Sequence, residues 1–191
     1  MARIGVLALQ GDFREHITAL ETVGAAAVEV RLASQLDTLD GLIIPGGEST
    51  TLRKLADAYD LMVPLRRFAA ERLVWGTCAG AILLARQIEG QEAHLGLMDI
   101  TVRRNAFGRQ IDSFVAPVEV QGDAVPYPAV FIRAPIIVSA GPEVTVLARL
   151  PDARIVAVQE GHWLATSFHP ELTRDVRFHE RFLHMSSGQP S

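Results

Sequence analysis

Residues 73–88 read LVWGTCAGAILLARQI and place a cysteine at the junction of a strand and a helix. We predict a buried strand over 73–75 and an apolar helix over 79–88, joined by the turn Gly76-Thr77-Cys78-Ala79-Gly80. This order is that of the G-x-S-x-G nucleophile elbow, with cysteine in place of serine. Small flanking residues let the turn close, and a helix N-terminus favours a thiolate. The stretch therefore predicts an α/β fold with a nucleophile at the edge of its sheet.

The rest of the first half alternates between strand and helix. The expected elements are strands over 2–9, 26–32 and 41–45 and helices over 12–24, 50–59 and 64–71. Asp12 and Glu15 have the spacing of a capping box at the start of the first helix. This alternation implies a mostly parallel sheet wrapped by helices, which is a three-layer α/β/α fold.

The second half changes character, because Gly, Pro and Asp interrupt its apolar runs. Here we expect short strands over 98–103, 114–120, 129–132, 144–149, 154–158 and 163–168, followed by a helix over 173–185. Little helix separates these strands, so some of them should pair antiparallel. The chain shows no linker and no repeat, which favours a single domain over residues 1–191.

Composition excludes several classes of function. The chain has 18 basic and 22 acidic residues, a net charge of -4, and no basic stripe that would bind nucleic acid. Its apolar runs fall short of the roughly 18 residues of a membrane span, and the run before Gln10 lacks the features of a signal peptide. Cys78 is the one cysteine, so it forms no internal disulfide. We expect a cytoplasmic protein that binds neither nucleic acid nor membrane.

A cysteine nucleophile needs a base, and the base needs a group that fixes its tautomer. His16 lies on a helix face that could be exposed, and the remaining histidines except one lie in the last helix or in loops. The exception is His169, which directly follows the expected strand 163–168. Glu171, two residues later, can reach its imidazole. A Cys78–His169–Glu171 triad competes with a structural cysteine and an ordinary His-Pro turn with a solvated glutamate.

The segment 45–51, PGGESTT, ends another buried strand. Gly46 and Gly47 can present bare backbone amides to a developing oxyanion, and the amide of Ala79 is the natural second donor. The competing interpretations are a phosphate-binding loop, or a glycine turn before a helix capped by Ser49 or Thr50. The spacing of a P-loop is absent.

Together these motifs resemble the class I (triad) glutamine amidotransferases, whose domain is flavodoxin-like. Further segments narrow the resemblance to the glutaminase subunits of pyridoxal phosphate synthase. They are LALQG with REH (7–11, 14–16), PGGESTT (45–51), GTCAG (76–80), RNAFGRQ (104–110), FIRAP (131–135) and SFHPELT (167–173). The similarity covers nearly the whole chain, from about residue 3 to about residue 185.

The resemblance implies a role for each matching position. Cys78 is the nucleophile, His169 the base and Glu171 the residue that orients it. The glutamine site is implied to comprise Gly46, Gly47, Glu48, Ser49, Arg104, Ile132 and Arg133, with Gly47 and Ala79 at the oxyanion. The implied reaction needs no cofactor and no metal. It releases ammonia from L-glutamine for a synthase subunit in a hetero-oligomer.

Other interpretations remain open at this point. The chain could serve a different synthase, such as one of histidine or purine biosynthesis, or be a non-catalytic sensor of the same fold with Cys78 as its reactive group. Arg104, next to Arg103, could be a solvated charge. Arg133, between a strand and a proline, could simply cap the strand end.

Overall fold

The computed structural model describes residues 1–105 and 113–185, and five neighbouring strands at its centre run parallel. In sheet order they are β2 (Ala26–Val30), β1 (Arg3–Leu7), β3 (Gly41–Ile44), β4 (Leu73–Thr77) and β12 (Trp163–Thr166). Every residue of β3 and β4 is buried, as expected for strands covered on both faces. Parallel strands end at the same edge, so the segments that follow β3, β4 and β12 meet there.

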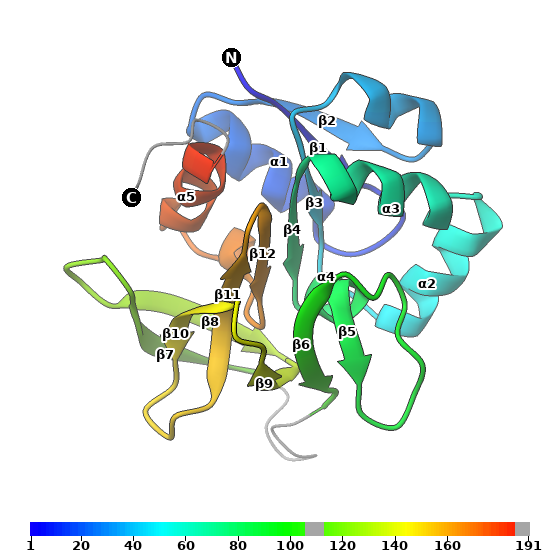
Figure 1. Cartoon of the computed structure of the whole chain (residues 1–191). Coiled ribbons are helices and arrows are strands. Elements are labelled where there is room, and N and C mark those ends of the chain that lie inside the picture. The colour runs from blue at the N-terminus through cyan, green and yellow to red at the C-terminus, as the bar shows by residue number, and fades with distance from the viewer. Residues whose placement is uncertain (106–112, 186–191) are drawn as a thin grey trace.

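Helices cover both faces of this parallel sheet (Figure 1). One face carries α1 (Phe13–Thr22) and α5 (Arg177–Met185); the other carries η1 (Ala33–Thr38), α2 (Ser49–Ala58), α3 (Met62–Glu71) and α4 (Ala79–Leu84). Leu20 of α1 and Phe182 of α5 belong to one buried apolar cluster. Leu52 of α2 and Leu65 of α3 belong to the other. The predicted three-layer architecture is confirmed.

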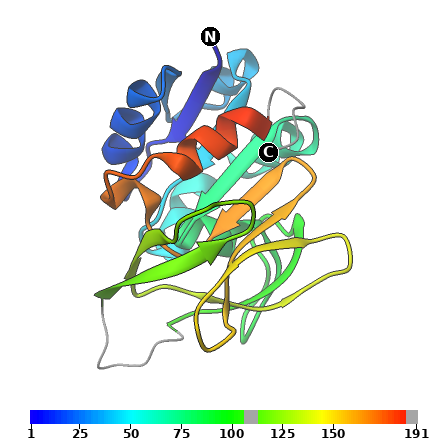
Figure 2. The ribbon, with the colours of Figure 1, turned by 90° about the vertical axis from the view of Figure 1, so that its left-hand side faces the viewer.

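The second half adds mainly antiparallel strands beyond β12, and Figure 2 shows them extending away from the helices. They are β5 (Ala85–Ile88), β6 (Met98–Arg103), β7 (Ser113–Val120), β8 (Tyr127–Ile132), β9 (Ile136–Ala140), β10 (Thr145–Arg149) and β11 (Ile155–Glu160). The sheet continues from β12 through β11, β10 and β7 to β8, while β9 pairs with β11 and β6. The expected antiparallel pairing is confirmed, and β9 is a strand that the sequence did not predict.

Two predicted elements were wrong in detail. The helix over 79–88 ends at Leu84, and residues 85–88 form β5, because Ala85 and its successors pair with β6 instead of continuing the helix. The capping box is also absent: Asp12 stands at the N-cap of α1 but makes no side-chain capping hydrogen bond. Its carboxylate lies instead 3.6 Å from Nδ1 of His169.

The last helix begins later than predicted. After His169 the chain forms a short 3-10 turn, η2 (Pro170–Leu172), and α5 begins only at Arg177. The intervening segment is held to β8 by the Tyr127 hydroxyl, which donates to the carbonyl of Asp175 at 3.0 Å. This anchoring keeps η2 beside the edge where the parallel strands end.

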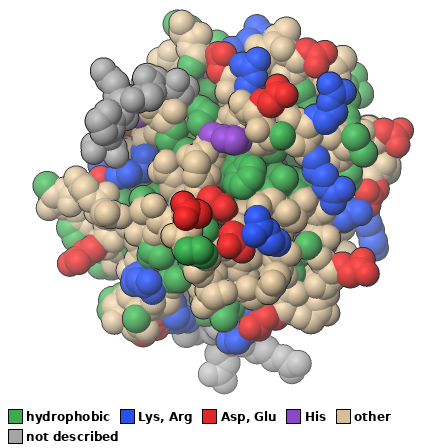
Figure 3. Space-filling view, viewed as in Figure 1, with side chains coloured by type: hydrophobic (Ala, Val, Ile, Leu, Met, Phe, Trp, Pro, Cys, Tyr) green, Lys and Arg blue, Asp and Glu red, His purple; other side chains and the backbone are tan. Residues whose placement is uncertain are grey.

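The surface agrees with the charge balance of the sequence. Figure 3 shows basic and acidic side chains interspersed over the face seen in Figure 1. No helix in the two described ranges, 1–105 and 113–185, is long and apolar enough to cross a membrane.

Candidate active site

Cys78 occupies a strained turn between β4 and α4. Its backbone has φ +49° and ψ -104°, a conformation that residues other than glycine rarely adopt. A Cβ atom on Gly76 would collide with the backbone of Gly80, and one on Gly80 would collide with the carbonyl of Ile44. The two flanking glycines are therefore required for the chain to turn here, as the elbow motif predicted.

His169 connects this thiol to a buried carboxylate. It follows β12, lies within hydrogen-bonding range of Cys78, and its Nδ1 is 2.7 Å from Oε1 of Glu171. The Glu171 side chain is fully buried. The structure thus brings together the three side chains that the sequence predicted from segments more than 90 residues apart.

The neighbours of these groups favour charge separation. Burial disfavours the cationic form of His169, but its contacts with Cys78 and Glu171 outweigh burial and raise the pKa of His169 to about 10. Burial would also raise the pKa of Glu171, yet the imidazoles of His16 and His169 hold it well below its usual range. His169 can therefore hold a proton given up by Cys78 while Glu171 stays ionised.

His16 is a buried member of this cluster, whereas the sequence suggested an exposed helix face. Its Nε2 lies 3.2 Å from Oε2 of Glu171 and 3.3 Å from the hydroxyl of Thr77, and its Nδ1 is 3.0 Å from Nε2 of His179. His179, on α5, is equally buried. The helical spacing of His16 with buried Leu20 could have revealed its position, but its contacts with Glu171 and His179 could not be read from the sequence.

These buried groups predict a loss of stability in acid. Burial and the neighbouring His16 lower the pKa of His179 to about 3, below the value of about 6.5 that histidine has in an unfolded chain. As the pH falls below 6.5, the unfolded chain binds a proton that the folded chain does not, so this contribution to stability is present above pH 6.5 and lost between about 6.5 and 3. The lowered pKa of Glu171 acts in the same direction below about pH 4.5.

We therefore expect the urea midpoint of unfolding to fall steadily from about pH 6.5 to pH 4.5. His179→Gln, which removes the titrating group, should flatten that slope. A midpoint that is constant over this range in the unsubstituted chain would contradict the expectation.

A cavity of about 660 Å³ opens above Cys78. Most of the residues that the resemblance assigned to the glutamine site line it, together with Cys78 and His169: they are Gly47, Glu48, Ser49, Arg104, Ile132 and Arg133. Gly46 packs against Cys78 and His169, Ala79 follows the nucleophile as the first residue of α4, and Glu171 lies behind His169. Residues 106–110 of the RNAFGRQ segment fall outside the described residues.

The glycine turn after β3 fits closely against the base. A Cβ atom on Gly46 would collide with the His169 ring, and Gly47 has φ +133°. The turn is held from the other side by Gln10, whose side-chain amide exchanges two 3.3 Å hydrogen bonds with the backbone of Glu48. Gln10 was not singled out as a site residue, and its contact with this turn joins segments 38 residues apart.

We expect Gly46→Ala to lower the rate of glutamine hydrolysis by about 100-fold, because the new methyl group must displace His169 by a fraction of an ångström to one ångström. Gly90→Ala is the matched control, since a Cβ atom there meets nothing within 4 Å. The control should lose some stability through its positive φ but keep its rate. Equal rates in Gly46→Ala and the control would contradict the placement of this turn.

Glu48, not Ser49 or Thr50, caps α2. Its carboxylate accepts from the backbone amides of Thr50 and Thr51, and these contacts outweigh burial and lower the pKa of Glu48 to about 2. The same carboxylate pairs with Arg104 at 3.0 Å, and Arg104 also donates to Gln91 at 3.1 Å. Arg104 is therefore held at the cavity wall and is not a freely solvated charge.

The backbone beside Arg133 approaches the nucleophile from the opposite side. The Cys78 thiol lies 3.8 Å from the carbonyl of Ile132, and Arg133 has φ +44°. This conformation turns the chain at the end of β8, directly beside the thiol. Sequence reasoning placed both residues at the site without predicting the backbone contact.

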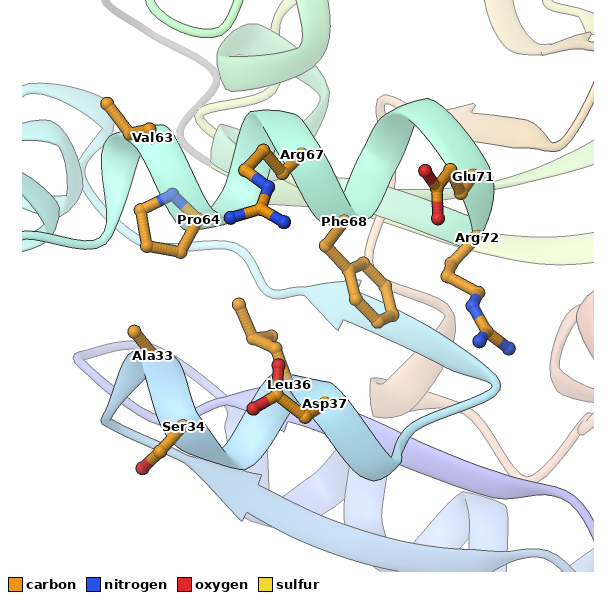
Figure 4. Close-up of a pocket in the computed structure, with 10 residues that line it drawn as sticks. All are labelled: Ala33, Ser34, Leu36, Asp37, Val63, Pro64, Arg67, Phe68, Glu71 and Arg72. Carbon is orange, nitrogen blue, oxygen red and sulfur yellow. The ribbon is translucent and has the colours of Figure 1, made fainter.

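Two other features are less suited to be the main site. A groove between η1 and α3, lined by Leu36, Arg67 and Phe68 among others, contains none of the predicted residues (Figure 4). Within the described part of the chain, Asp12, His169 and Glu171 form the one group with the spacing of metal ligands. The 2.7 Å contact between His169 and Glu171 already occupies the imidazole nitrogen that this group would offer.

Comparison with known proteins agrees with this geometry. Residues 6–187 match the SNO glutamine amidotransferase family. A protein of Dehalococcoides mccartyi named pyridoxal 5'-phosphate synthase subunit PdxT is 56% identical over 96% of this chain and 97% of its own length. The protein of the same name from Geobacillus kaustophilus is 57% identical over 96% and 94%. A crystal structure of a glutamine amidotransferase superposes with a TM-score of 0.90, at 49% identity over 96% of this chain and 98% of that one. The chain belongs to the SNO glutamine amidotransferase family.

Proposed function

We propose that this chain is the glutaminase subunit of a pyridoxal 5'-phosphate synthase, and that it hydrolyses L-glutamine to glutamate and ammonia. The observation that carries the proposal is the arrangement at Cys78: His169 contacts the thiol and bonds at 2.7 Å to buried Glu171. Relatives that match this chain over nearly their whole length are named as subunits of that synthase. We place the chain in a cytoplasmic hetero-oligomer with the synthase subunit.

The first half of the reaction forms a thioester. His169 takes the proton of Cys78, and the thiolate attacks the side-chain amide carbon of glutamine. The oxygen of the tetrahedral intermediate is stabilised by backbone amides at Gly47 and Ala79. The carbon–nitrogen bond then breaks, and His169 gives its proton to the leaving nitrogen, which departs as ammonia. Glu171 stabilises the imidazolium of His169 between the two transfers.

The second half regenerates the enzyme. Water attacks the thioester while His169 accepts its proton, the carbon–sulfur bond breaks, and the proton returns to Cys78 as glutamate leaves. Each step uses only side chains and backbone of this chain together with glutamine and water. Ammonia released into water would become ammonium, which is not a nucleophile. A partner protein that receives the ammonia directly can therefore use it as a nucleophile.

The cavity wall suits the amino-acid end of glutamine. Arg104 is a planar donor that matches a carboxylate, and it lies beside Glu48 at the cavity. We propose that Arg104 binds the α-carboxylate of glutamine, while Ile132 and Arg133 hold the amide end against Cys78. This arrangement orients the reacting carbon toward the thiol.

Arg104→Gln is expected to raise the KM for glutamine about 10- to 100-fold with a small change in kcat, because a charge-assisted contact to the bound substrate is lost. Arg103→Gln is the matched control: Arg103 is the preceding residue in the chain but pairs with Glu89 at the exposed surface. Its KM should be unchanged. An unchanged KM in Arg104→Gln would remove Arg104 from the substrate site.

The direct test of the proposed partner is the fate of the nitrogen. Glutamine labelled with ¹⁵N at its side-chain amide should yield labelled pyridoxal 5'-phosphate when this chain and the synthase subunit are combined with the sugar phosphates that the synthase uses. Labelled ammonia without labelled product, although the synthase is active with added ammonium, would keep the glutaminase and overturn the partner.

A further inference from the structure

Beyond the three residues of the triad, two buried histidines continue the line of polar contacts into the core. Oε1 of Glu171 contacts His169, whereas Oε2 makes no hydrogen bond in the described part of the chain and has His16 at 3.2 Å. Both side chains of that pair are fully buried. A buried carboxylate with one oxygen left without a partner tends to take up a proton. The position of His16 counters this tendency.

His16 also contacts the nucleophile turn. Its Nε2 is 3.3 Å from the hydroxyl of Thr77, the residue before Cys78. A hydrogen on this nitrogen meets hydrogen-bond geometry with the Thr77 hydroxyl, and Oε2 of Glu171 lies beside it, 3.2 Å from the same nitrogen. One imidazole thus lies between the carboxylate that orients the base and the strand end that carries the thiol.

The contact with His179 selects the tautomer of His16. Nδ1 of His16 lies 3.0 Å from Nε2 of His179, while Nδ1 of His179 has no hydrogen-bond partner among the described residues. Buried N–H groups without an acceptor are rarer than buried acceptors without a donor. The hydrogen of neutral His179 therefore sits on Nε2 and points to His16. Nδ1 of His16 is then the acceptor, and its own hydrogen sits on Nε2.

We propose that His16, oriented by His179, is a positioning residue that holds its Nε2–H beside Oε2 of Glu171 and so keeps the triad carboxylate ionised and fixed against His169. Its edge-on contact with Trp75, and that of His179, hold both rings in place. His179 lies on α5, so the C-terminal helix is coupled to the reacting groups through two side chains. The predicted effect of His16 on glutamine hydrolysis rests on the proposed function, whereas its predicted effect on the reactivity of Cys78 does not.

The first test reads the tautomers without any substrate. In ¹⁵N spectra of histidine side chains at pH 7, we expect His16 and His179 each to carry the hydrogen on Nε2 and none on Nδ1, and His16→Gln and His179→Gln assign the two signals. A hydrogen on Nδ1 of His16, in either its neutral or its cationic form, would overturn the proposal.

The second test compares two amides of different reach. The side-chain nitrogen of His16→Gln can take the place of Nε2 near Glu171, whereas that of His16→Asn reaches only the position of Nδ1. The rate of Cys78 alkylation by iodoacetamide, per folded molecule at pH 7, should fall about 10- to 100-fold in His16→Asn and be largely recovered in His16→Gln. Glutamine hydrolysis with the synthase subunit should show the same order in kcat, with KM changed much less.

A control separates this role from simple loss of stability. His162→Leu removes a 2.7 Å contact with the carbonyl of Ala69, away from the triad, and should lower the melting temperature without changing alkylation. Wild-type alkylation rates in His16→Asn, or equal losses in both amides, would overturn the proposal. If the unsubstituted chain is alkylated but does not hydrolyse glutamine with the synthase, the proposed function fails while alkylation still decides the role of His16.

Discussion

Cys78→Ala is expected to reduce glutamine hydrolysis at least 10⁴-fold, to the background rate, with no change in fold. The reaction loses its nucleophile, and removing the nucleophile of a triad enzyme lowers kcat by about 10⁶-fold in the best-studied case. Cys78 is 4% exposed and its Cβ atom fits the turn, so alanine should be accommodated. The measurement is glutamate release in the presence of the synthase subunit, with glutamine binding measured separately by calorimetry.

Binding should survive this substitution, because Arg104 and the backbone at Ile132 remain in place. Cys78→Ser is the companion variant: it keeps a hydroxyl in the same position and should also be nearly inactive, since an alcohol is a far weaker nucleophile beside the same base. Hydrolysis by Cys78→Ala within 100-fold of the unsubstituted chain would show that another group performs the chemistry.

Glu171→Gln should lower kcat by about 10⁴-fold, the loss seen when the carboxylate of a triad is replaced by an amide. The amide cannot stabilise an imidazolium, and its NH₂ group can turn toward Nδ1 of His169 and stabilise the tautomer that cannot accept a proton from Cys78. Because the side chain is fully buried, its shape must be preserved, and glutamine is the closest neutral replacement.

A second readout for Glu171→Gln is the rate of Cys78 alkylation, which should slow at pH 7 together with kcat. The control is the secondary structure, which should stay intact. Steady-state hydrolysis with the synthase subunit checks the magnitude. A kcat within tenfold of the unsubstituted enzyme would mean that Glu171 does not orient His169 during the reaction.

The local motifs predicted residues that the structure brings together, because each motif carries its own geometry. The elbow at Cys78 requires small neighbouring residues and a strand–helix junction, and both can be predicted from the sequence. His169 and Gly46 follow buried strands, and in a parallel sheet such positions share one edge. Topology thus brought together residues that the sequence could identify only one by one.

Other features depended on partners that the sequence does not place. Residues 85–88 have good helix formers, but their pairing with β6 overrides that propensity. The sequence placed His16 on a helix face that could be exposed, whereas the structure buries it. Its burial follows from a second helix, α5, that reaches it from 163 residues away. Glu48 as the cap of α2, and its pairing with Arg104, likewise depend on contacts between distant segments.

The central claim is that this chain releases ammonia from glutamine for a pyridoxal 5'-phosphate synthase. The most direct measurement is glutamate release by the purified chain, alone and with the synthase subunit added in equal amount. The account predicts rapid release with the synthase and much slower release without it. No release under either condition, from a chain whose Cys78 is still alkylated by iodoacetamide, would contradict it and favour a sensor of the same fold.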